Sequence, residues 1–560
     1  MSLRLLESGT TIPLHSDEIA ARNQACEPGP GRNTFRMREL EDGALIVRSC
    51  VEFLLRFSSR FSVHAYGADL SGSEISDQEE AMVLASEARQ KQDGQGDCAQ
   101  SREPSGSRET AMRYPQTTRL VVVLLSLGFA GFACADTIYV NNISGNDDWD
   151  GLCEEWDGGT CGPKKTVQAG IDAASNGDEV IVSPGTYNEV INFIGRAITL
   201  RSSDGPEVTI IDGAGLNDSV VKCYAGEDRD TRLEGFAIKN GTGDPNNPVP
   251  AWLGYHEGGG MINVGSSPTV INCIFDSNRV TAPGSDGGGM ANWESAPCVV
   301  DCVFINNTAR GVAGGMVNAY SNAEIINCYF ISNTSDTHGA GINNVFSSPI
   351  IINCCFAGNR VTVIGYWGGA IANRCNDNTS FPQILNCTFV ANDSPQPGVI
   401  WTDFGSHPTI TNCVFWDNLT VPFGGSGAPI VTYCNVEGGY AGEGNIDADP
   451  QFFRDPAPGD DGEWGTADDD YGDLRLMPFS QCIDAGDTTA VPADLFVDLD
   501  GLGRRIDNPD VDDTGVTVGL IPVTVDMGAY EYHRRNGDIN GDGDVNAYDI
   551  DGFILLVGWG

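Results

Sequence analysis

An acidic loop near the C-terminal end of the sequence carries oxygen-bearing side chains at the spacing of a calcium site. Residues 538–549 read D-I-N-G-D-G-D-V-N-A-Y-D. Oxygen ligands fall at loop positions 1, 3, 5, 9 and 12, and Gly543 at position 6 permits the tight turn that such loops need. We therefore predict calcium as a cofactor. The predicted ligands are Asp538, Asn540, Asp542, Asp544 (through its carbonyl), Asn546 (directly or through water) and Asp549.

A second group of residues combines aromatic rings with carboxylates. Rings stack on the faces of sugars and carboxylates accept hydrogen bonds from sugar hydroxyls, so this combination predicts a site for a polysaccharide or a cell-surface glycan. The alternative is that the rings pack loops onto the body of the protein. The candidate carbohydrate-binding residues are Trp252, Tyr255, Trp293, Glu294, Tyr320, Trp367, Trp401 and Asp403.

The motifs that would identify a known enzyme class do not occur in the sequence. There is no GxSxG, HExxH or P-loop pattern, and the six histidines form no ligand cluster. Hydrolysis of a glycosidic bond needs two carboxyl groups roughly 5–10 Å apart. Carboxylates on adjacent repeats, of the type of Glu294 and Asp403, could supply such a pair, although no motif singles one out. The catalytic residues, and whether the protein is an enzyme, therefore stay open.

The elements that must position these side chains are copies of one repeat. A phrase such as GGGMINV is followed by a phrase such as PTVINCIFDSN, six times between residues 258 and 418. The period is 26–33 residues, shorter than a four-stranded propeller blade or most two-helix repeats, and it lacks helical apolar spacing. Short β-branched stretches separated by Gly and Asn predict strands, stacked about 4.8 Å apart as turns of a parallel β-coil. The period is counted between Cys273, Cys302, Cys328, Cys354, Cys387 and Cys413.

The pattern within each repeat predicts which side chains face inward and where the chain bends. Cys273 and Phe275 are nearly invariant among the copies and share a strand face, whereas Val270 is out of phase with them. The chain must therefore turn near Asn272, and Asn tolerates the left-handed conformation of such a corner. Stacked Asn side chains also hydrogen-bond to one another along the stack, as in the columns that begin at Asn263, Asn272 and Asn278.

These repeats resemble those of the right-handed parallel β-helix, the fold of pectate lyases and many surface proteins. The phrases GG-A/G-I/M and F-x-x-N are also similar to the repeats of polymorphic outer-membrane proteins. The resemblance covers residues 136–450 and implies an all-β, right-handed parallel β-helix solenoid. If the protein is an enzyme, it implies a polysaccharide lyase or glycoside hydrolase of the pectate-lyase-like fold. Pectate lyases place an Arg base beside acidic calcium ligands, but the arginines here are scattered without an Asp column: Arg279, Arg310, Arg360 and Arg374.

The C-terminal loop resembles a different family. Residues 538–549, with the apolar stretch IDGFILLVG that follows, are similar to one dockerin repeat, with Asp549 where EF-hands carry Glu. Dockerins attach secreted polysaccharide-degrading enzymes to cohesin modules, so the resemblance implies a cohesin-like partner. A dockerin has two such repeats and this sequence has one at residues 536–560, so the resemblance supports calcium binding more than cohesin binding.

A secretory signal occupies residues 112–135. It has basic Arg113 and Arg119, an apolar run over 120–132 and an Ala-Cys-Ala cleavage site before Asp136. The apolar run is shorter than the roughly 20 residues of a membrane span, which is the alternative. We expect Met112 to be the true start, residues 1–111 to lie outside the folded protein as a mis-assigned, disordered upstream segment, and the mature protein to be secreted or on the cell surface.

The charge balance narrows the possible partners. The chain has 77 acidic and 32 basic residues, a formal net charge of −45. So acidic a surface disfavours nucleic acid and anionic membranes as partners, and it suits calcium, whose ligands are carboxylate oxygens.

Smaller features complete the expected domain organisation. Residues 167–174 predict a short amphipathic helix that caps the first turn of the coil, and residues 451–535 form an acidic segment that closes it. The stacked cysteines are expected to be buried thiols, since parallel neighbours one strand apart do not meet the geometry of a disulfide. Cys153 and Cys161 are the expected disulfide.

Together these features predict a secreted β-helix protein that binds or processes polysaccharide and carries a calcium-binding, dockerin-like tail. The alternative is a non-catalytic surface or adhesion protein. Catalytic carboxylates clustered in an outward groove would favour the first function, and a smooth surface without them would favour the second.

Overall fold

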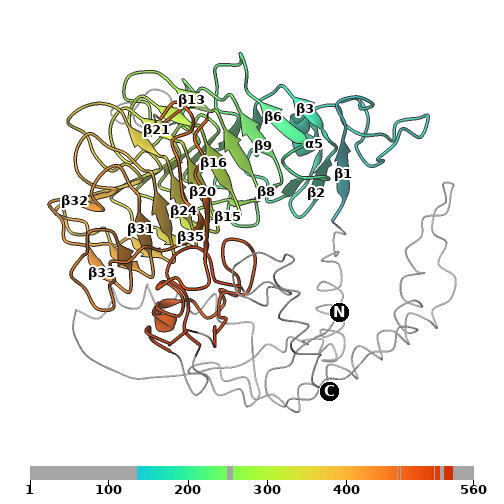
Figure 1. Cartoon of the computed structure of the whole chain (residues 1–560). Coiled ribbons are helices and arrows are strands. Elements are labelled where there is room, and N and C mark those ends of the chain that lie inside the picture. The colour runs from blue at the N-terminus through green and yellow to red at the C-terminus, as the bar shows by residue number, and fades with distance from the viewer. Residues whose placement is uncertain are drawn as a thin grey trace, which may run out of the picture. The chain divides into compact units, whose positions relative to one another are not determined.

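The computed structural model describes residues 135–248, 257–462, 464–466, 468–509, 511–517 and 523–533. Within these residues the dominant structure is a parallel β-helix, in which each turn contributes one strand to each of three sheets (Figure 1). Every strand pair in these sheets is parallel, for example β10 with β14 and β14 with β18. The predicted all-β coil is therefore confirmed, and its right-handed winding stays a prediction.

Sheet 1 has 11 described strands and runs the length of the coil. Its strands, in spatial order, are β1 (Thr137–Val140), β2 (Glu179–Val182), β5 (Thr199–Ser202), β8 (Arg232–Glu234), β11 (Thr269–Ile271), β15 (Cys298–Val300), β19 (Glu324–Ile326), β23 (Ile350–Ile352), β27 (Gln383–Leu385), β30 (Thr409–Thr411) and β33 (Ile430–Thr432).

Sheet 2 follows sheet 1 within each turn and has 10 described strands. They are β3 (Gly185–Tyr187), β6 (Thr209–Asp212), β9 (Ala237–Lys239), β12 (Ile274–Asp276), β16 (Val303–Ile305), β20 (Tyr329–Ile331), β24 (Cys355–Ala357), β28 (Thr388–Val390), β31 (Val414–Trp416) and β34 (Asn435–Val436). A smaller sheet lies beyond it in the middle turns, made of β13 (Arg279–Val280), β17 (Thr308–Ala309), β21 (Thr334–Ser335) and β25 (Arg360–Val361).

Sheet 3 carries the glycine-rich phrases of the repeat and has nine described strands. They are β4 (Ile191–Asn192), β7 (Val221–Cys223), β10 (Met261–Val264), β14 (Met290–Trp293), β18 (Met316–Ala319), β22 (Ile342–Val345), β26 (Ile371–Arg374), β29 (Ile400–Thr402) and β32 (Phe423–Gly425).

The interior of the coil is built from columns of identical residues. Phe275 and Phe304 stack with ring centroids 4.7 Å apart, and the same contact is repeated along the column as far as Phe415. The Cys273 column is fully buried and unbridged, and each thiol donates to the carbonyl two residues before it, as Cys273 does to Ile271 at 3.3 Å. Both columns lie inside, as predicted.

The predicted corner at Asn272 is present and separates sheets 1 and 2. Asn272 has φ +49°, in the left-handed region, and its copies on the later turns have the same conformation. The Asn263 column is also buried, and Asn263 donates from Nδ2 to Oδ1 of Asn292 at 2.8 Å. The asparagine columns are thus structural.

Helix α5 (Val167–Ala173) lies beside the first turn. Thr166 caps it by accepting from the Ala169 N–H, and its buried residues Val167 and Ile171 join the interior cluster. A Cβ added to Gly170 would lie 2.6 Å from Val140 Cγ2 and 2.9 Å from Val180 Cγ1, so the glycine lets the helix approach strands β1 and β2. The predicted Cys153–Cys161 disulfide is also present.

The described part of residues 451–533 packs along the side of the coil (Figure 1). It contains the antiparallel pair β35 (Phe452–Arg454) and β36 (Asp473–Leu476) and the short helix η2 (Thr488–Ala490), and is otherwise irregular. Leu474, Met527 and Tyr530 cover Cys355 and Val390 on the outer face of sheet 2. Val491 and Leu495 cover Ile352 and Leu385 on sheet 1. None of the helices in the described part has the length and apolarity needed to cross a bilayer.

Candidate functional site

The outer face of sheet 3 carries the residues best placed for chemistry. Strand residues alternate between faces, and Asn263 and its copies point inward, so the positions on either side of them point outward. The register of sheet 3 aligns Trp293, Ala319, Val345 and Arg374 in one outward column. Asp403 follows β29 in the same column, since its N–H bonds to the Asn373 carbonyl at 2.9 Å.

A hollow of about 340 Å³ opens on this face. Its charged lining comes from Asp286, Arg374 and Asp403. Asp286 precedes β14 and Asp403 follows β29, and four strand spacings separate those two strands in the sheet. At about 4.8 Å per spacing, the turns that carry Asp286 and Asp403 lie roughly 19 Å apart along the coil axis. We call the hollow the sheet-3 groove; its remaining lining residues are Val312, Val345, Phe346, Cys375 and Asn376.

The positive charge of Arg374 acts on both carboxylates of the groove, those of Asp286 and Asp403. Burial raises the pKa of Asp286 to about 7, although a hydrogen bond from the Val312 N–H (2.7 Å) and the charge of Arg374 oppose the rise. Burial also raises the pKa of Asp403, again against Arg374. Burial therefore favours the protonated form of Asp286, which suits a residue that exchanges protons.

Glu257 lies directly beside Asp286 on the preceding turn. The Gly258 N–H bonds to the Asp286 carbonyl at 3.1 Å, so the two carboxyl-bearing residues are in register, about 4.8 Å apart along the stack. Glu257 is only 5% exposed and its Oε1 has no hydrogen-bond partner. Burial, and then the charge of Asp286, raise the pKa of Glu257 well above its usual value. The pair therefore carries fewer than two negative charges at neutral pH.

Aromatic rings surround His338 farther along the same face. The His338 ring centroid lies 5.0 Å from Tyr366, 4.9 Å from Trp367 and 6.1 Å from Trp401, and the two tryptophans are 4.7 Å apart. Burial, and then Arg374, lower the pKa of His338 to about 4, so the ring is neutral. His338 Nδ1 and Trp367 Nε1 are buried without hydrogen-bond partners. A second hollow of about 410 Å³ lies against Trp367 and Trp401.

The structure does not bring the candidate carbohydrate-binding residues together at one site. Trp367 and Trp401 meet at the second hollow, and Asp403 lines the sheet-3 groove. Trp293 is 8% exposed and packs with Ile262 and Val317, so it follows the packing alternative. Tyr320 is 46% exposed and stacks on Phe346, 5.1 Å away. Trp252, Tyr255 and the six calcium-loop residues lie outside the described residues.

Glu294 and Asp403 do not themselves form a pair on adjacent repeats. Glu294 is exposed at the end of β14, and Asp403 follows β29, four strand spacings away. That separation of about 19 Å far exceeds the roughly 5–9.5 Å between the carboxyl groups of glycosidases.

Asp286 and His338 were missed by the sequence reasoning. Both stand directly before the glycine-rich phrase of their repeat, in the column shared by Glu257 and Trp367. The sequence itself shows that each of these residues directly precedes the glycines, and this shared position identifies the column.

Comparisons with known proteins give distant structural likeness. No family model and no curated protein matches the chain. Pectate lyase Pel9A is 15% identical with a TM-score of 0.36, over 72% of this chain and 98% of that one. A pectin methylesterase from Aspergillus niger is 12% identical with a TM-score of 0.26, over 53% and 86%. A pectin methylesterase from carrot is 10% identical with a TM-score of 0.24, over 57% and 88%. The parallel β-helix assignment itself rests on the strand pairing described above.

Proposed function

We propose that this protein binds polysaccharide outside the cell, with the sugar chain lying along the outer face of sheet 3. The observation that supports this most directly is the sheet-3 groove, in which Arg374 lies between two carboxyl groups. Carboxyl and guanidinium groups offer acceptors and donors to sugar hydroxyls, and the nearby indole rings of Trp367 and Trp401 offer stacking surfaces. A groove that follows the coil axis suits a linear polymer.

Binding without cleavage is the form of this function that the groove favours. Asp286 and Asp403 are too far apart along the sheet to act as a glycosidase pair. Glu257 and Asp286 lie on adjacent turns, but Glu257 is buried beneath the surface. The second candidate, a non-catalytic surface or adhesion protein, is supported by the same separation.

Binding to a panel of neutral and acidic polysaccharides tests the proposal. We expect the full chain to bind at least one member, and Trp401→Ala to weaken that binding by about tenfold or more, which is about 1.4 kcal/mol. The matched control is Trp156→Ala, because Trp156 is 57% exposed and lies in the loop between Cys153 and Cys161, away from sheet 3. Equal affinity of the two variants, or no binding to any polymer, would reject the outer face of sheet 3 as the binding site.

The same incubations separate binding from processing. Release of reducing ends or unsaturated products would identify an enzyme, and Asp286→Asn should then reduce the rate because it removes the titrating proton. Binding with intact polymer would leave a non-catalytic function.

The tail is proposed to add a calcium site to this protein. The support is the ligand spacing over residues 538–549, and the partner proposed from it is a cohesin-like module. Calorimetry of the parent and of Asp538→Ala/Asp542→Ala should show loss of one bound calcium in the variant. Equal uptake would place the calcium elsewhere in the chain.

A further inference from the structure

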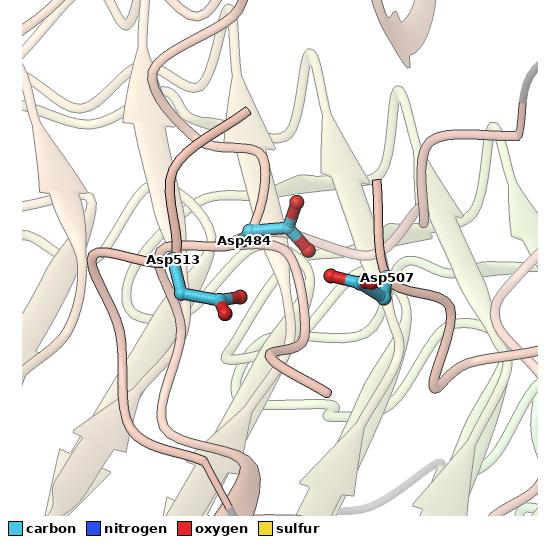
Figure 2. A group of neighbouring side chains, drawn as sticks. All are labelled: Asp484, Asp507 and Asp513. Atoms are coloured by element: carbon cyan, nitrogen blue, oxygen red, sulfur yellow. The ribbon is translucent and has the colours of Figure 1, made fainter. Parts of the chain in front are cut away.

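Three aspartates from separate stretches of the C-terminal segment converge on one point (Figure 2). Asp484, Asp507 and Asp513 each direct a carboxylate oxygen into the cluster, and these oxygens lie within 4.8 Å of one another. Asp484 is fully buried, whereas Asp507 and Asp513 are exposed. None of the three is a candidate ligand in the tail loop or part of the sheet-3 groove.

The carboxylate of Asp484 is held in place but incompletely satisfied. Its Oδ2 accepts a hydrogen bond from the Asn508 N–H at 3.2 Å, while its Oδ1 is buried with no partner. Figure 2 shows this carboxylate directed toward Asp507. Burying a carboxylate oxygen without a hydrogen-bond donor costs free energy. The unpartnered oxygen therefore points to a bound ligand that is not part of the protein.

The backbone around Asp484 ties the three stretches together. The Asp484 N–H donates to Asp526 Oδ1 at 2.8 Å, and its carbonyl accepts from the N–H groups of Thr514 and Gly515 at 3.0 and 3.1 Å. Asp484 adopts φ +50°, which a non-glycine residue rarely takes unless the surroundings hold it there. The site is therefore built by the fold of the segment and not by side chains that meet by chance on a surface.

Charge in this cluster is unbalanced. Among the described residues, none of the three aspartates forms an ion pair. The buried Arg504 is engaged with Glu531, 3.4 Å away. Crowded carboxylates of this kind are stabilised when a cation binds between them.

We infer that Asp484, Asp507 and Asp513 bind one calcium ion. The donors are all carboxylate oxygens, which hard cations prefer. The three oxygens lie within 4.8 Å of one another, a spread small enough for one calcium ion, with ligand distances of about 2.3–2.6 Å, to sit among them. Calcium also accepts irregular arrangements of ligands, whereas magnesium demands near-ideal octahedral geometry. The exposed side of the cluster leaves room for the waters that complete a shell of about 6–8 ligands.

The ion would fasten the C-terminal segment to the coil. Three residues after Asp484, the Asp487 N–H donates to Asn412 Oδ1 at 2.6 Å and its carbonyl accepts from Asn412 Nδ2 at 3.0 Å. Asn412 belongs to the corner column that begins at Asn272. The site thus joins the irregular stretches of the segment at the point where the segment is anchored to the coil.

Calcium titration of the full chain tests this inference, in the Asp538→Ala/Asp542→Ala background so that the tail loop does not contribute. We expect about one bound calcium in that background, and at least a tenfold loss of affinity on adding Asp507→Asn/Asp513→Asn. Both exposed side chains keep their size, so the variant should fold. The control adds Asp494→Asn/Asp512→Asn, which removes the same charge from exposed positions of the same segment.

Proteolysis provides the second measurement. Calcium should slow cleavage within residues 451–533 in the background and control proteins, and a chelator should reverse this, while the Asp507→Asn/Asp513→Asn protein should be cleaved equally with and without calcium. Three results would overturn the inference: equal calcium affinity in the Asp507/Asp513 and Asp494/Asp512 variants, no calcium binding in the background protein, or tighter binding of magnesium than of calcium. The polysaccharide assay plays no part in this test, so either proposal can fail alone.

Discussion

At the corner between sheets 1 and 2, an asparagine serves two purposes in every repeat except that of Cys302, which has Asp301 there. Its left-handed conformation, φ +51° at Asn353 and +50° at Asn386, bends the chain. Its side chain then bonds along the column, as Asn386 Nδ2 does to Asn353 Oδ1 at 3.2 Å. Asparagine is favoured here because it tolerates this region of φ and has both a donor and an acceptor for its own copies.

The carboxyl group of Asp286 should make stability depend on pH. Its pKa is raised from 3.8 to about 7, so the folded state holds its proton more tightly than the unfolded state. That contribution to stability is fully present below about pH 4 and is lost as the pH rises through about 7. Relative to the parent, Asp286→Asn should therefore gain stability across this window, by on the order of 1–4 kcal/mol at about 1.4 kcal/mol per pKa unit.

Denaturant unfolding at several pH values between about 4 and 7.5 measures this difference. The control is Glu294→Gln, which changes an exposed carboxylate at the end of β14. A stability difference between Asp286→Asn and the parent that stays constant with pH would contradict the expectation.

The stacked cysteines should remain reduced in the folded protein. Thiols on adjacent turns run parallel about 4.8 Å apart, whereas a disulfide needs Cβ atoms about 3.8 Å apart, and burial raises the pKa of the Cys273 thiol well above its usual value. Thiol counting in denaturant without reductant should find the six cysteines of this column free, while Cys153 and Cys161 react only after reduction. Disulfide-linked peptides from adjacent turns would disprove this.

At the scale of the elements, the columns set the register of the sheets. The strands of the middle turns are only two to four residues long, too short to fix a register by their backbone bonds alone. Inside the coil, the backbone N–H and Nδ2 of Asn307 both donate to Oδ1 of Asn333. The same two groups of Asn333 donate to Oδ1 of Asn359, and all four distances are 3.0–3.2 Å. A slip by one residue would break these bonds and turn the phenylalanines outward, so the columns specify one alignment.

Removing one member of this column should be costly. Asn333→Ala removes the buried acceptor of the Asn307 N–H and of one Nδ2–H of Asn307, while the other Nδ2–H still donates to the Phe275 carbonyl, so we expect a loss of about 2–4 kcal/mol in the free energy of unfolding. Asn322→Ala, at an exposed position between β18 and β19 of the same repeat, should cost less than about 1 kcal/mol. Similar losses in chemical denaturation of the two variants would show that the column does not contribute as argued.

Across the described part of the chain, the three sheets of the coil have different surroundings on their outer faces. The segment after residue 450 contacts the outer faces of sheets 1 and 2, and the groove lies on sheet 3. Burial of apolar side chains at those contacts attaches the segment, and the proposed calcium site would reinforce the attachment. The formal net charge of −45 makes cations the natural counterpart of this protein.

Cleavage of the predicted signal during export should set the N-terminus of the mature protein. The basic, apolar and small-residue parts of residues 112–135 match the pattern of a cleaved signal, so we predict that the protein is secreted and that its mature form begins at Asp136. Mass spectrometry of the protein recovered from the medium measures this, with a variant that carries Arg in the apolar run as the non-exported control. A mature N-terminus within the first hundred residues would contradict the assignment.

The repeat by itself determined the coil, its inward columns and its corner. In a parallel stack the neighbours of a residue are its own copies on the adjacent turns, so the constancy of Cys273 and Phe275 and the phase change at Val270 could be read directly as geometry. The same logic identified Asn272 as the corner residue, because few other side chains accept its φ.

Only the tertiary structure decided which unrepeated residues meet. Asp286, His338, Arg374 and Asp403 lie in four different turns, and their contacts depend on the register of sheet 3 and on the reach of the Arg374 side chain. Asp484, Asp507 and Asp513 come from irregular stretches, where no period relates sequence distance to spatial distance. A repeat fixes its own neighbours through backbone pairing, whereas side chains outside the repeat are brought together by packing between distant parts of the chain.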